Sequence, residues 1–141
     1  MAKPLYLLDL PVLAELTRAD GNRRIFTLFQ QRQSLCALAA PALITWLRGL
    51  DGLPEGHRRQ QLSAFTAELL ACGPSVLPID REAALWLARQ AGRWDRAGRR
   101  WSRLDGEQAA IAASQDMALV SRLPHPLANT DGLRIEDWFR P

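Results

Sequence analysis

Two aspartates stand where a metal-dependent reaction could take place. Asp9 directly follows the apolar run at residues 4–8, and Asp105 opens a later helix. Ligands of an open parallel sheet bind beyond the carboxyl ends of its strands, so the two carboxylates could converge at one edge. Carboxylate oxygens suit Mg²⁺ and Mn²⁺, which makes the pair a candidate cation site. Taken singly, each aspartate is more simply explained as a helix cap or turn residue.

A basic segment at residues 89–103 is a second candidate. Arg93, Arg96 and Arg100 would share one helical face if the helix continued past Gly98. Basic side chains interleaved with aromatic rings suit phosphate contacts combined with base stacking. The alternative, which we favour, is a solvated helix face whose tryptophans pack inward. The interleaved tryptophans are Trp86, Trp94 and Trp101.

The elements that would position these residues alternate between strands and helices. Short apolar runs bounded by turn residues predict strands at residues 4–8, 34–39, 76–79, 117–121 and 133–135. Helical spacing predicts helices at residues 12–16, 23–33, 41–50, 54–72, 81–97 and 105–115. Asp80 is expected to cap the helix that follows it by accepting from the backbone N–H of Glu82 or Ala83. This alternation predicts a three-layer α/β/α sandwich around a mostly parallel sheet, in one domain over residues 1–141.

The composition excludes several classes of protein. Of 141 residues, 48% are hydrophobic and 23% are charged, which argues against disorder. The longest uncharged stretch, residues 33–47, is shorter than the roughly 18 residues that a membrane span needs. Asp9 also interrupts the apolar N-terminal run before a signal-peptide core could form. We therefore expect a soluble, cytoplasmic protein.

Charge and cysteine content add two expectations. The formal net charge of +3 permits a nucleic-acid partner without requiring one. Cys36 and Cys72 both lie in apolar, helix-like surroundings, with no second cysteine or histidine at ligand spacing. They are predicted to be buried thiols in a reducing compartment, and a zinc site is not expected.

Several segments follow one another in an order typical of a known family. Residues 6–16 read Tyr-Leu-Leu-Asp-Leu-Pro-Val-Leu-Ala-Glu-Leu, residues 105–113 read Asp-Gly-Glu-Gln-Ala-Ala-Ile-Ala-Ala, and residues 119–122 read Leu-Val-Ser-Arg. They resemble PIN-domain ribonucleases of the VapC and FitB type, whose corresponding segments carry Asp-Thr-Asn, Asp-Ala-Gln-Ile-Ala-Ala and Leu-Val-Thr-Arg. The resemblance covers essentially the whole chain. Shorter matches lie at residues 48–49, 53–56, 76–80, 98–99 and 133–135.

The resemblance implies a PIN-type sandwich in which three or four acids hold Mg²⁺ or Mn²⁺. The first and third acids of the family carry over to Asp9 and Asp105. The second falls on Thr45 and the fourth falls near His125-Pro126, so the positions of Thr45 and Pro126 are degenerate. The polar pair that follows the first acid in the family is also replaced here, by Leu10-Pro11. Other side chains that could take the place of the missing acids are Glu107, Asp116 and His125.

Two functions are compatible with this pattern. The favoured one is a VapC-like protein of toxin–antitoxin type with weak or lost ribonuclease activity, which acts by binding a small antitoxin protein or RNA. The alternative is an active Mg²⁺- or Mn²⁺-dependent endoribonuclease toxin that uses Asp9 and Asp105. The resemblance also implies a homodimer. A bound cation is needed only if the protein is active.

Overall fold

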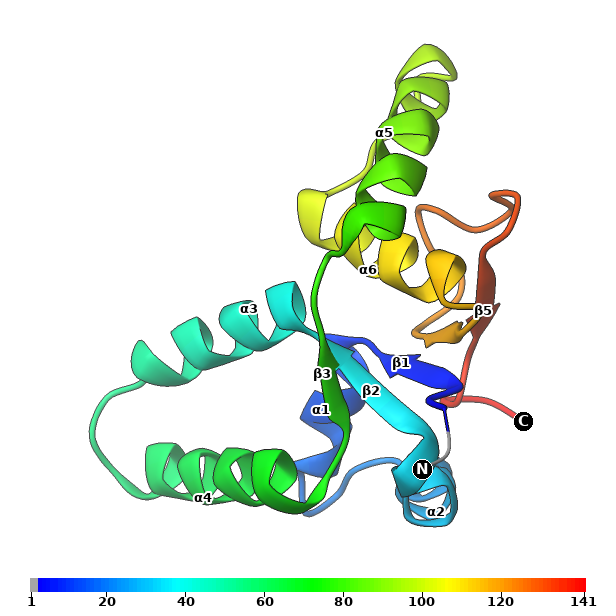
Figure 1. Cartoon of the computed structure of the whole chain (residues 1–141). Helices are drawn as coiled ribbons and strands as arrows, with labels where there is room; N and C mark the ends of the chain where they lie inside the picture. The colour runs from blue at the N-terminus through cyan, green and yellow to red at the C-terminus, as the bar shows by residue number, and fades with distance from the viewer. Residues whose placement is uncertain (1–2) are drawn as a thin grey trace.

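Five short strands form the central sheet of the computed structural model, which describes residues 3–141 (Figure 1). They lie in the order β3-β2-β1-β4-β5, and every pairing is parallel, which agrees with the mostly parallel sheet that was predicted. The strands are β1 (Tyr6–Leu8), β2 (Cys36–Ala39), β3 (Ser75–Leu77), β4 (Ala118–Val120) and β5 (Arg134–Glu136).

The strand order turns back at β1, and this places the site. The chain builds β1, β2 and β3 outward in one direction and then returns to add β4 and β5 on the other side of β1. In open α/β sheets the crevice beside such a switch point, at the carboxyl ends of the strands, is where ligands bind. Asp9 follows β1 directly, and Ser121 follows its neighbour β4.

Helices cover both faces of the sheet and complete the three layers predicted from the sequence. Leu8, Val120 and their neighbours pack against α1, α2 and α4 on one face. Leu7, Leu119 and their neighbours pack against α5, α6 and the start of α3 on the other. The helices are α1 (Leu10–Leu16), α2 (Arg23–Arg32), α3 (Ala40–Asp51), α4 (His57–Cys72), α5 (Arg81–Arg96) and α6 (Arg103–Ser114), and a 3₁₀ turn, Gln33–Leu35, precedes β2.

The helix ends confirm one predicted cap and correct another boundary. Asp80 Oδ1 accepts a hydrogen bond from Ala83 N at 2.9 Å, as expected. Asp105 does not open its helix, because Ser102 Oγ accepts from Asp105 N at 3.1 Å and the helix begins at Arg103. Asp105 therefore lies in the first turn of α6, where the helix dipole favours a negative charge.

Two further details depart from the expectations, and the end of α5 agrees with them. Helix α4 begins at His57, whereas the Pro-Glu pair at 54–55 was expected to open it. Helix α5 ends at Arg96, and Gly98 follows with φ +71°, a left-handed conformation that suits glycine. Cys36 is buried in β2, but Cys72 is exposed at the end of α4, so the prediction of two buried thiols is wrong for Cys72.

The helices are also short by membrane standards. Within residues 3–141, none combines the length and the apolar character that crossing a bilayer would demand.

Candidate functional site

Asp9 lies at the carboxyl end of the central strand β1, where three hydrogen-bond donors hold its side chain. Its Oδ1 accepts from Leu10 N at 2.8 Å and from Gln108 Nε2 at 3.0 Å. Its Oδ2 accepts from Ser121 Oγ at 2.7 Å. The side chain is thus the cap of α1, as the simpler interpretation proposed, and is fixed by groups from three separate elements. Only 7% of the residue is exposed, and the three hydrogen bonds fix its carboxylate in place at the end of β1.

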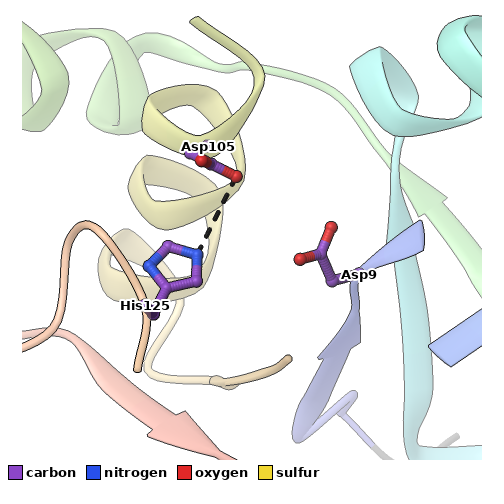
Figure 2. Close-up of side chains that lie close together, drawn as sticks. All are labelled: Asp9, Asp105 and His125. Atoms are coloured by element: carbon purple, nitrogen blue, oxygen red, sulfur yellow. Dashed lines mark ion pairs between the residues drawn. The ribbon is translucent and has the colours of Figure 1, made fainter. Parts of the chain in front are cut away.

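Asp105 and His125 face Asp9 across a common space (Figure 2). Asp105 comes from α6, and its Oδ1 lies 3.8 Å from His125 Nε2. His125 comes from the loop between β4 and β5. One ligand atom from each of the three residues lies within 4.8 Å of the others. The structure therefore brings together the two aspartates singled out in the sequence, with a histidine that the sequence named only as a substitute.

The other two candidate substitutes are occupied elsewhere. Asp116 pairs with Arg134 at the start of β5, the end of the sheet opposite to the site. The hydrogen bond and the charge of Arg134 hold the pKa of the Asp116 carboxyl below its usual value. Glu107 Oε2 lies 3.4 Å from Arg103 Nε, one turn earlier in α6.

Two buried polar atoms at this site have no hydrogen-bond partner. Within residues 3–141, Gln108 Oε1 and His125 Nε2 are the only such side-chain nitrogen or oxygen atoms. Each costs roughly 1–3 kcal/mol if it is left unsatisfied. Gln108 touches Asp9, and His125 faces Asp105, so both atoms belong to the same small region. This concentration of unsatisfied polar groups is typical of a place built to receive a polar ligand.

The fold has counterparts among solved structures. DNA-bound VapBC from Salmonella typhimurium matches with a TM-score of 0.80 at 20% identity, over 96% of this chain and 98% of that one. FitAcB from Neisseria gonorrhoeae matches with a TM-score of 0.79 at 19% identity, over 97% of this chain and 100% of that one. The chain has a VapC/FitB-like PIN-domain fold.

A more distant PIN-fold match is VapBC-5 from Mycobacterium tuberculosis, described as a member of the VapBC family of toxin–antitoxin systems. It gives a TM-score of 0.68 at 20% identity, over 94% of this chain and 98% of that one. No protein-family model matches the sequence, and no curated protein matches it. At these levels of identity the likeness establishes the PIN fold and leaves the activity to be argued from the site.

Thr45 and Pro126, the two positions predicted to be degenerate, make local contacts in the structure. Thr45 is exposed on α3, and its hydroxyl donates to Pro41 O at 3.2 Å within the same helix. Pro126 O accepts from Arg99 NH2 at 2.6 Å.

Beside Asp9 the wall of the site is apolar, and it opens into a groove of about 420 Å³. Its lining residues come from α1, α3, α4 and the turn before α4: Leu10, Pro11, Ala14, Thr45, Trp46, Gly49, Leu50, Leu53 and Leu62.

The tryptophans of the basic segment pack inward, as the favoured interpretation of this segment expected. Trp94 is buried, and its ring centroid lies 5.9 Å from that of Trp86 and 5.2 Å from that of Trp101. The three rings pack around Ala109 and Leu127 in a small apolar cluster. Trp86 and Trp94 meet edge to face and Trp94 and Trp101 meet at a tilt, so the three rings pack against one another in this cluster.

The arginines of the segment divide into two groups. Arg93 and Arg96 are exposed on α5, and Arg100 is exposed beyond its end, so the continuous face expected from the spacing is interrupted at Gly98. Arg99 instead reaches the loop that carries His125. Its NH2 donates to Pro126 O at 2.6 Å and to Ala128 O at 2.7 Å.

Proposed function

We propose that this protein is a VapC-like partner in a toxin–antitoxin pair, with a site that supports at most weak metal-dependent cleavage of RNA. The observation that carries the proposal is the composition of the site. Asp9 and Asp105 converge at the switch point of a PIN-type fold, and the sequence resemblance assigns Thr45 and Pro126 to the positions of the other two acids. Such a site keeps part of a cation-binding set and lacks the rest.

The donor set suits one divalent cation better than two. Mg²⁺ is commonly bound by one or two protein carboxylates, with waters and substrate phosphate completing its shell. Asp9 and Asp105 match that description, since both carboxylates face the same space (Figure 2). When bound, such a cation would stabilise the charge that builds on a phosphate. Two carboxylates are too few for a pair of cations, which is the physical reason for expecting weak activity.

The apolar groove beside Asp9 supports the proposed antitoxin partner. The similar structures include toxin–antitoxin assemblies, and an antitoxin segment with apolar side chains would fit a groove formed by Leu10, Trp46, Leu50 and their neighbours. Burying this groove would remove apolar surface from water, which favours association by about 25 cal/mol per Å² before the ordering costs are counted. A partner seated there would also lie next to the carboxylate of Asp9, because Leu10 lines the groove.

A calorimetric titration with Mn²⁺ tests the cation site. We expect binding at millimolar concentration or tighter in the wild type and none in Asp9→Asn, which keeps the size of the side chain and removes its charge. Asp116→Asn is the matched control, because Asp116 is an exposed aspartate at the opposite end of the sheet. Absence of Mn²⁺ binding by the wild type would remove the cation site from the proposal.

Coexpression tests the partner. Where a short reading frame lies directly upstream of this gene, its product should copurify with the protein, and Leu50→Asp in the groove should abolish the association. A Leu85→Asp variant on exposed α5 is the control. Copurification that persists unchanged in Leu50→Asp would show that the groove is not the contact surface.

A second candidate function is a fully active endoribonuclease, and the position of His125 favours it. His125 comes from the loop where the fourth family acid would stand, and it faces Asp105 at 3.8 Å. Rapid cleavage of a structured RNA by the purified protein, lost in Asp105→Asn, would establish this function in place of the weak one.

A further inference from the structure

The hydrogen bond on one ring nitrogen of His125 determines what the other nitrogen can do. Leu127 N donates to His125 Nδ1 at 3.0 Å, inside the protein. A backbone N–H is always a donor, so Nδ1 must present its lone pair. A neutral imidazole carries its single proton on the other nitrogen. Nε2 therefore carries the hydrogen, and this N–H points toward Asp105 (Figure 2).

This tautomer is unsuited to binding a cation through Nε2. A metal ligand needs the lone pair of the nitrogen, which would require the proton to move to Nδ1. Nδ1–H would then face the N–H of Leu127 at 3.0 Å, donor against donor. Leu127 is fully buried, and its N–H would lose its acceptor, at a cost of about 1–3 kcal/mol. His125 thus differs in kind from Asp9 and Asp105, although all three lie close together.

The N–H of His125 has no acceptor of its own. The distance from Nε2 to Asp105 Oδ1 is 3.8 Å, which is too long for a hydrogen bond. The side chain is only 4% exposed, and Nε2 has no other partner. A buried donor aimed into a candidate site and left without an acceptor is expected where a ligand oxygen completes the bond.

We propose that His125 is a fixed, neutral hydrogen-bond donor to a phosphate oxygen of RNA bound at the Asp9–Asp105 site, and that it does not ligate the cation. The inference rests on the proposed function, since it assumes that the site receives a phosphodiester. A phosphate oxygen is anionic, so a neutral N–H donor binds it without adding positive charge that would repel a cation on the carboxylates. Donors fixed before the ligand arrives are the effective ones, because no reorganisation is needed.

The loop around His125 is built to hold the donor in place. Arg99 donates to Pro126 O and Ala128 O, on either side of the buried Leu127. Trp94 Nε1 donates to Thr130 Oγ1 at 3.1 Å, and that hydroxyl donates to Leu127 O at 2.8 Å. Groups from α5 and the segment after it therefore fix the residue whose N–H sets the tautomer of His125.

Nuclear magnetic resonance tests the tautomer without any reference to activity. In long-range ¹H–¹⁵N correlation spectra, a protonated ring nitrogen and a lone-pair nitrogen resonate at well-separated positions. The chain has two histidines, and His57→Gln leaves only the signals of His125. We expect Nε2 to be protonated and Nδ1 not, both before and after addition of Mg²⁺. A proton on Nδ1, or loss of the Nε2 proton when Mg²⁺ binds, would overturn the proposal.

Binding measurements test the ligand that the donor serves. The probes are Mn²⁺ alone and a short RNA in the presence of Ca²⁺, measured on the wild type, His125→Gln and His125→Leu. We expect the RNA affinity of His125→Leu to fall by at least about tenfold, as for loss of a bond to a charged group, and His125→Gln to recover most of it through its amide N–H. The affinity for Mn²⁺ should change by less than about twofold in both, whereas loss of a true ligand would cost at least about tenfold.

The two proposals fail in different ways. Equal RNA affinity in all three proteins, with Mn²⁺ binding intact, would refute the role of His125 and leave the cation site standing. Absence of Mn²⁺ binding in the wild type would refute the proposed site, while the tautomer would still be read from the spectrum. Thermal unfolding of each variant shows whether it is folded, and His125→Gln keeps the test valid if His125→Leu does not fold.

Discussion

Gln108 Nε2 donates a hydrogen bond of 3.0 Å to Asp9 Oδ1 across a separation of 99 residues in the sequence. The bond ties α6 to the end of β1, and it leaves Gln108 Oε1 fully buried with no partner. A buried amide with only one of its two polar atoms hydrogen-bonded lowers the stability of the folded protein. The presence of Gln108 at this position is therefore better explained by its contact with Asp9 in the candidate site than by a contribution to stability.

We expect Gln108→Leu to unfold with a free energy within about 1 kcal/mol of the wild type, or higher. The change removes an unsatisfied acceptor together with one of three donors to Asp9. Ser121→Ala is the comparison, because it removes the hydrogen bond that Oδ2 of Asp9 accepts, and it should cost about 1–3 kcal/mol. Urea denaturation measures both. A lower free energy of unfolding for Gln108→Leu than for Ser121→Ala would contradict this account.

Arg99 anchors the loop of His125, and its removal should loosen that loop. Arg99→Met keeps much of the stem and removes the charged donors to Pro126 O and Ala128 O, which is expected to cost about 1.5–3 kcal/mol. Arg96→Met, on the exposed face of α5, should stay within about 0.5 kcal/mol of the wild type. Hydrogen exchange at the amide of Leu127 should accelerate in Arg99→Met alone. Equal exchange in both variants would show that Arg99 does not hold the loop.

The sheet was predictable from sequence because its signals are local. Each strand is a short apolar run bounded by turn residues, and β1 to β5 appear near the residues where these runs lie. Asp9 was predictable as a candidate site residue for the same reason, since it directly follows a buried strand. The cap of the α5 helix by Asp80 likewise depends on residues no more than three positions apart.

The role of His125 could not be predicted, because it depends on contacts that are far apart in the sequence. The hydrogen bond from Leu127 N determines which ring nitrogen of His125 carries the proton, and Arg99 and Trp94 hold the loop that contains Leu127. From sequence alone, Arg99 was one of several arginines of apparently equal standing. The prediction that Cys72 is buried was wrong for a related reason. Its sequence neighbours are apolar, but its position at the end of α4 leaves it exposed.

The exposed arginines can still contact phosphates, without base stacking by the buried tryptophans. We expect the double variant Arg93→Gln, Arg100→Gln to bind RNA more weakly. The slope of log K against the logarithm of the salt concentration should become shallower by the amount that corresponds to the loss of about two phosphate contacts. The control is Arg23→Gln, Arg24→Gln on α2, which removes the same charge from an exposed helix. Binding titrations at several salt concentrations measure the slope. An equal change in both double variants would assign the effect to net charge alone.

The two cysteines should differ sharply in reactivity. Burial raises the pKa of the Cys36 thiol to about 12, against the smaller opposing effect of Arg32, so the reactive thiolate is scarce at neutral pH. Cys72 is exposed. Iodoacetamide should therefore modify Cys72 and spare Cys36 in the native protein, as read by mass spectrometry of peptides. Addition of urea should expose both. Rapid native labelling of Cys36 would show that β2 opens more readily than its burial implies.

Asp137 should make stability depend on pH in the acid range. Burial by itself raises the pKa of this carboxyl, but hydrogen bonds from Leu123 N, Phe139 N and Arg140 outweigh it and leave the pKa below its usual value of 3.8. The folded protein then releases the proton more readily than the unfolded chain does. The stabilisation is present above the unfolded value and is lost as the pH falls through the folded one.

Asp137→Asn tests this directly. The variant should be less stable than the wild type at neutral pH by about 1–2 kcal/mol, because hydrogen bonds to a charged acceptor become bonds to a neutral one. The gap should close as the pH falls below 3.8 and through the lowered pKa of the folded protein, where the wild-type carboxyl takes up its proton. Asp131→Asn, at an exposed loop position, should show no such dependence. Thermal unfolding from neutral to acid pH measures the difference, and a gap that is constant across that range would mean that Asp137 acts through its shape and not its charge.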